Sequence, residues 1–145
     1  MLHTVLVLRR LESEPAPIRR LGQGLFDRFC RDMDGSLREM GVGDLAVPDK
    51  MRKIGEAFYG RQAAYGAALG APDLAPLIAA LTRNVFGAEP GTELGASRLA
   101  TYVRAAAGQL ADQDGGALGR AEVSFPDPEG LPVTGTQPGG PATTR

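Results

Sequence analysis

The sequence predicts an all-α protein, a single compact bundle of about five helices followed by a disordered, Pro/Gly-rich C-terminal tail. Apolar residues recur at steps of three and four in several long segments, which is the spacing of a helix face packed on a core. Alanine and glycine supply much of the hydrophobic fraction of 43%, a composition that favours closely packed helices. We expect residues 1–128 to form one helical domain and residues 129–145 to form the tail.

The first two helices are predicted over residues 2–11 and about 17–40. In the first, leucine and valine side chains make a broad apolar face, and Arg9 and Arg10 lie in the last turn, where cations complement the helix dipole. Pro17 suits the first turn of the second helix. Gly35 could kink this helix, and Gly41 is predicted to end it because glycine readily adopts the left-handed conformation.

Three more helices are predicted over residues 48–69, 74–86 and 95–110. Asp73 is a plausible cap for the middle one of these. The helix over 48–69 also carries a second stripe of small residues that would let another helix approach its backbone closely. This stripe consists of Ala57, Gly60, Ala64, Ala68 and Ala71. After these helices, repeated prolines and glycines predict disorder beyond about Glu129.

The charge and cysteine content exclude several classes of protein. The net charge of -1 argues against DNA and other strongly polyanionic partners. A single cysteine, Cys30, allows no internal disulfide and favours a reducing compartment. No apolar stretch approaches the roughly 20 residues of a membrane span. We therefore expect a cytoplasmic protein, with the inner face of the membrane as an alternative location.

The sequence lacks a recognisable catalytic or metal-binding set. His3 is the only histidine, so a Ser-His-Asp triad or a site with two histidine ligands has too few residues. A role for His3 as a haem ligand or a base stays open, but a polar position at a helix start is favoured. Residues 41–46, GVGDLA, fit a dinucleotide-binding pattern but follow a predicted helix instead of a strand. We predict no enzyme activity, no cofactor and no metal.

Several motifs occur in an order that is more specific than any one of them. They are LHTVLVLRRL at residues 2–11, MDGSLREMGVGDLAVP at 33–48, AFYGRQAAY at 57–65, RNVFG at 83–87, LATYVRA at 99–105 and FPDP at 125–128. Together they resemble the ubiquinol–cytochrome c chaperone family over about residues 2–128. The absence of an organellar presequence and the richness in Ala, Gly and Arg fit a bacterial member.

The resemblance implies a function in assembly of the cytochrome bc1 complex, respiratory complex III. A member of this family would hold newly made cytochrome b, and a small helper protein and the ribosomal exit region are further partners left open. The resemblance also implies further helical sequence upstream of residues 2–11, so we expect that part of the family's domain is missing here. A helical adaptor or dimerisation module unrelated to respiration stays open as an alternative.

Two surfaces are candidates for partner binding. One is the loop after the second helix with the cations Lys50, Arg52 and Lys53, which lie where the positive helix end disfavours them. The other is the helix over 48–69, where Tyr59 is predicted to be exposed beside the small-residue stripe. Alternatively, the charges form solvated pairs four residues apart, and the small stripe packs on the second helix. The candidate residues are Asp34, Arg38, Glu39, Gly41, Gly43, Asp44, Lys50, Arg52, Lys53, Tyr59, Gly60 and Arg61.

Overall fold

The structure, a computed structural model, describes residues 1–132, and within them it contains helices and no strands. This confirms the predicted all-α class. The helices are α1 (Leu2–Glu12), α2 (Ala16–Arg19), α3 (Leu21–Glu39), α4 (Val47–Leu69), α5 (Ala75–Asn84), α6 (Glu93–Asp112), α7 (Gly115–Gly119) and the 3-10 helix η1 (Pro128–Gly130).

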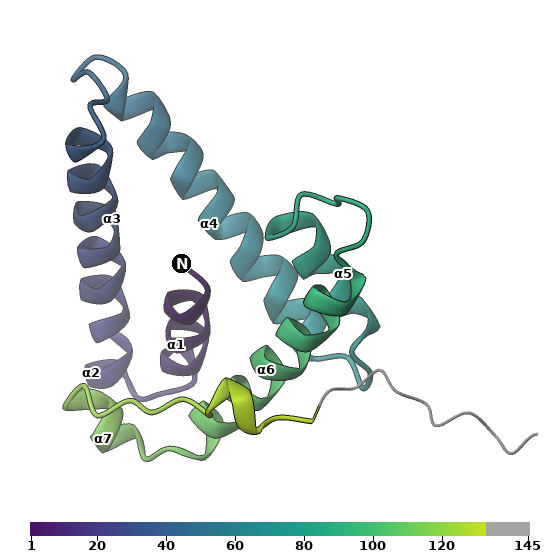
Figure 1. The fold of residues 1–145 in the computed structure, drawn as a ribbon. Helices are drawn as coiled ribbons and strands as arrows, with labels where there is room; N and C mark the ends of the chain where they lie inside the picture. The colour runs from purple at the N-terminus through teal and green to yellow at the C-terminus, as the bar shows by residue number, and fades with distance from the viewer. Residues whose placement is uncertain (133–145) are drawn as a thin grey trace, which may run out of the picture.

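The two long helices α3 and α4 form a V whose closed corner is the loop between them (Figure 1). Helix α1 lies between the arms of the V, and α5 and α6 pack beside the far end of α4 (Figure 1). Helix α1 therefore contacts α3, α4 and α6 at once. These neighbours account for the broad apolar face of α1, because they bury side chains on several sides of it, among them Val5, Leu6 and Leu8.

The core combines large apolar side chains with the small side chains of α6. Phe58, Leu77 and Leu81 are fully buried, and Ala100 and Ala106 in α6 have no exposed surface. The small residues let α6 come close to α5 and α1. The burial of the small-residue stripe predicted in α4 varies along the helix. Ala68 is buried, but Gly60 is exposed, with open space where a Cβ atom would stand.

The boundaries differ from the prediction at several places. The predicted helix over 17–40 is divided into α2 and α3, because the amide of Gln23 bonds the carbonyl of Arg20 three residues earlier, at 3.2 Å. Helix α3 runs without a break through Gly35, where the sequence suggested a kink. Asp73 does bond the start of α5, where its carboxylate accepts from the amide of Ala75 at 2.8 Å.

The short helices α7 and η1 were not predicted. Each begins beside an aspartate whose carboxylate accepts an amide of the first turn: Asp114 accepts from Ala117, and Asp127 accepts from Glu129, both at 2.9 Å. The glycines and prolines of these segments favour loops, so the capping aspartates were not recognised as helix starts. The predicted tail begins at residue 129, inside η1, and its remaining part from 133 onward lies outside the described residues.

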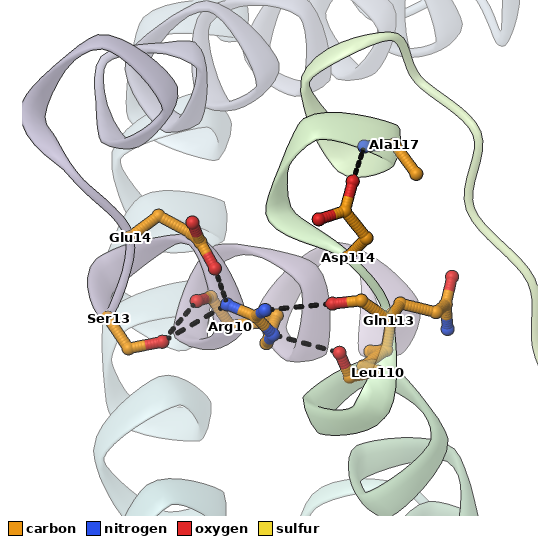
Figure 2. Close-up of polar contacts among 7 residues, drawn as sticks. All are labelled: Arg10, Ser13, Glu14, Leu110, Gln113, Asp114 and Ala117. Carbon is orange, nitrogen blue, oxygen red and sulfur yellow. Dashed lines mark hydrogen bonds and ion pairs between the residues drawn. The ribbon is translucent and has the colours of Figure 1, made fainter.

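Three arginines join helices by donating to backbone carbonyls at or just beyond helix ends. Figure 2 shows the first, Arg10 of α1, whose guanidinium donates to the carbonyls of Leu110 at 2.8 Å and Gln113 at 3.0 Å. It also pairs with the carboxylate of Glu14. Carbonyls at a helix end lack partners within the helix, so a cation there supplies both hydrogen bonds and a favourable charge.

The other two arginines act on α5 and on the link before it. Arg61 of α4 donates to the carbonyl of Asn84, the last residue of α5, at 2.8 Å. Arg104 of α6 donates to three carbonyls in the segment between α4 and α5. Their acceptors are Ala71 at 3.0 Å, Pro72 at 3.2 Å and Asp73 at 2.7 Å.

Candidate functional site

The corner between α3 and α4 is built on a glycine in the left-handed conformation. Gly41 has a φ of 80°, its amide bonds the carbonyl of Arg38 at 2.9 Å, and the amide of Val42 bonds the carbonyl of Leu37 at 3.0 Å. This pair of bonds closes the last turn of α3 in the Schellman arrangement. The prediction that Gly41 ends the helix is confirmed.

Replacing Gly41 by alanine is expected to lower the free energy of unfolding by about 1 kcal/mol, because an L-residue is strained at this positive φ. Gly43→Ala is the matched control, since its φ is not positive and a Cβ atom there meets open space. Urea denaturation followed by circular dichroism measures both. Equal stability of the two variants would contradict the assignment of the cap to Gly41.

Three of the predicted partner-binding residues form an ion network at this corner. The guanidinium of Arg38 bonds the carboxylate of Asp34 at 2.7 Å and also that of Asp44 in the loop. Hydrogen bonding to Asp34, more than any other cause, raises the pKa of Arg38. The network fixes the loop relative to α3. Glu39 and Gly43 are exposed at the same corner, and two large apolar side chains there are also open to solvent: Met40 is 71% exposed and Leu45 is 100% exposed.

The cations at the start of α4 are largely paired with acids of the same helix. The carboxylate of Asp49 bonds Arg52 at 2.8 Å and Lys53 at 2.9 Å, and Arg52 also bonds Glu56 at 2.5 Å. Hydrogen bonds from Lys53 and then Arg52 hold the pKa of Asp49 below its ordinary value. The conflict with the helix dipole is thus offset locally. Lys50 is exposed and makes no ion pair within residues 1–132.

A groove of about 370 Å³ opens between α1, α3 and α4, and we call it the α1–α3–α4 groove. Its apolar lining consists of Leu8, Leu11, Phe26, Phe58 and Tyr59. The aromatic rings contact one another: the centroid of Phe26 lies 5.0 Å from that of Phe58 and 5.5 Å from that of Tyr59. Tyr59 is 58% exposed, so the prediction of its exposure is confirmed.

The other two candidates on α4 lie outside this groove. Gly60 is exposed but does not line it, and Arg61 is half-buried with its guanidinium on the carbonyl of Asn84. Partner contact by either residue stays a prediction. The residues that sequence reasoning missed are Phe26 and the polar rim of the groove. The one sequence feature that could have indicated Phe26 is its position next to the apolar stripe of the second predicted helix.

His3 and Cys30, the two residues considered as a base, a ligand or a nucleophile, lie in surroundings that do not favour those roles. The imidazole Nε2 of His3 lies 2.7 Å from the hydroxyl of Tyr102, and the imidazole ring packs edge-on against Phe125 at 4.6 Å. Burial, and next the charge of Asp27, raise the pKa of the Cys30 thiol, which disfavours the reactive thiolate. Within residues 1–132, no three His, Cys, Asp or Glu side chains cluster in a way that could hold a metal ion. In the same residues, no helix combines the length and hydropathy needed to cross a bilayer.

Comparison with known proteins places the chain in a family. No curated protein matches it. The crystal structure of the Cbp3 homolog from Brucella abortus superimposes with a TM-score of 0.81 and 39% sequence identity, covering 90% of this chain and 72% of that chain. The sequence profile of the ubiquinol-cytochrome C chaperone family matches residues 1–125, which include α3 and α4, the two arms of the V, and α1 between them. The chain therefore belongs to the ubiquinol–cytochrome c chaperone family.

Proposed function

We propose that this protein is an assembly chaperone of the cytochrome bc1 complex that binds newly made cytochrome b in the cytoplasm of a bacterium. The observation that carries the proposal is the open α1–α3–α4 groove, with its cluster of aromatic and leucine side chains, on a member of this chaperone family. Apolar segments of an unassembled membrane protein aggregate in water, and a groove of this kind shelters part of such a segment. The proposal involves no catalysis and no cofactor.

The test is deletion of the gene in the native organism, followed by the absorbance spectrum of b-type haem and a bc1 activity assay. We expect both signals to fall and to recover when the wild-type chain is restored. Restoration with Tyr59→Ser should recover less, because this exposed ring is part of the groove lining. Normal amounts of assembled bc1 complex in the deletion strain would refute the proposal.

A second candidate function, that of a protein–protein adaptor, is favoured by the exposed apolar side chains Met40 and Leu45 at the corner. In a chaperone the same corner would serve a helper protein or the ribosome. Recovery of a stable partner protein, and not cytochrome b, with the tagged chain would support the adaptor function.

Lys50→Glu tests whether the corner contributes to partner capture. Because Lys50 is exposed and unpaired within the described part of the chain, its reversal should change the free energy of unfolding by less than about 0.5 kcal/mol. We expect weaker retention of the partner in a pulldown at low salt, since exposed charges act over roughly 30 Å at about 0.01 M ionic strength. Unchanged retention would show that this cation is not part of the binding surface.

A further inference from the structure

The rim of the α1–α3–α4 groove carries two arginine side chains without partners. Arg19 is the last residue of α2, and Arg20 lies between α2 and α3. Both are exposed and line the groove, and within residues 1–132 neither side chain makes a hydrogen bond or ion pair. The guanidinium groups are therefore available to a ligand in the groove.

Three other polar side chains of the rim, those of Glu12, Gln23 and Gln62, make hydrogen bonds within the chain. The carboxylate of Glu12 accepts a hydrogen bond from the amide of Gln62 at 2.8 Å, and the amide of Gln23 donates to Asp27 at 2.7 Å. By residue type, the two arginines and the one glutamate give the rim a formal charge of +1. Among residues 1–132, the cations of the rim are Arg19 and Arg20, and both lack a partner.

This combination of apolar lining and cationic rim favours one class of ligand. A purely apolar helix would cover the lining but would cut water off from the arginines without giving them a partner, which is unfavourable. A basic segment would meet like charge. An amphipathic helix with carboxylates beside its apolar face would satisfy both features, because such helices place their apolar face in a groove and their charges along its edge.

We propose that the α1–α3–α4 groove binds an amphipathic helix that carries acidic side chains next to its apolar face, with Arg19 and Arg20 as their partners. The inference refines the proposed function by giving the chemistry of the bound segment. It depends on the proposed function in one respect only, which is that the bound helix comes from an unassembled client protein.

The experiment uses two synthetic helical peptides and the full chain. The first peptide has an apolar stripe of leucines with one tryptophan, flanked by glutamates, and the second has lysine at each glutamate position. The chain contains no tryptophan, so the tryptophan emission reports on the peptide alone. We expect the glutamate peptide to shift its emission to the blue on titration and to bind about tenfold more tightly than the lysine peptide at low salt.

The double variant Arg19→Glu/Arg20→Glu should reverse this preference. Arg83→Glu/Arg98→Glu is the matched control, since it makes the same change in net charge at exposed positions on α5 and α6, away from the groove. The control should keep the preference for the glutamate peptide. Circular dichroism confirms that both double variants retain the helical fold.

Equal affinity for the two peptides, no binding of either, or an unchanged preference in Arg19→Glu/Arg20→Glu would each overturn the inference. Sedimentation would also overturn it if the wild-type chain were a dimer and Arg19→Glu/Arg20→Glu, but not the control, were a monomer. A second copy of the chain would then occupy the groove. Peptide binding together with a normal bc1 complex in the deletion strain would support the groove chemistry and refute only the client proposed above.

Discussion

Phe58→Ala is expected to lower the free energy of unfolding by about 3–5 kcal/mol, the range for deleting a buried phenylalanine side chain. Phe58 has no exposed surface, and its ring lies 5.0 Å from that of Phe26 and 5.2 Å from that of Phe29. These contacts join α4 to α3 across the V. Because domains are stable by only roughly 5–15 kcal/mol, this loss is a large fraction of the total stability. Urea denaturation followed by circular dichroism measures the loss.

Phe58→Leu serves as the control, because it keeps most of the apolar volume and should cost markedly less than the alanine variant. The neighbouring Tyr59→Ala removes an aromatic ring that is 58% exposed and should also cost far less. Similar stabilities for Phe58→Ala and Tyr59→Ala would contradict the central place of Phe58 in the core. The same titration with the glutamate peptide should show weaker binding to Tyr59→Ala, since this exposed ring lines the groove.

Arg104→Ala is expected to lower the free energy of unfolding by about 2–4 kcal/mol, because hydrogen bonds from a charged donor contribute more than neutral ones. Its guanidinium donates to three consecutive carbonyls, those of Ala71, Pro72 and Asp73. These carbonyls belong to the link between α4 and α5, so their loss of a partner also loosens the packing of α5 on α6. Thermal and urea unfolding measure the effect.

Two further variants separate the hydrogen bonds from the general effect of charge. Arg98→Ala removes an exposed arginine of the same helix and should change the stability by less than about 0.5 kcal/mol. Arg104→Lys keeps the charge but lacks the planar fork that reaches several carbonyls, so it should recover only part of the loss. Full recovery with lysine would show that the charge alone matters.

The helices were predictable because their signals are local. Apolar spacing located five of them, and Gly41 marked the end of α3 through its backbone conformation. The arginine bonds were not predictable, because their acceptors are backbone carbonyls far along the chain. Arg61 reaches a residue 23 positions away and Arg104 reaches one 33 positions away. Side-chain type says nothing about such acceptors.

Only those features of the candidate site that depend on a single helix were predicted from the sequence. Tyr59 was expected to be exposed from its phase in the helix over 48–69, and it is. The groove, however, also takes Leu8 from α1, Arg19 from α2 and Phe26 from α3, so it exists only once these three helices are packed with α4. The motifs that carry the family resemblance include structural positions as well. Gly41, Arg61 and Asn84 lie in them and form contacts at helix ends, and Arg104 lies in them and bonds the link between α4 and α5.

The bonds of Arg10 set an order for folding of the chain as it is synthesised. Its acceptors on Leu110 and Gln113 lie 100 and 103 positions later, so α1 cannot complete its contacts until those residues have left the ribosome. Until then the apolar face of α1, with Val5 and Leu6, lacks its contacts with α6 and has the earlier helices α2, α3 and α4 as neighbours. Closure of contacts this distant in sequence is slow compared with helix formation. Part of the apolar face of α1 therefore stays uncovered during synthesis until α6 has emerged.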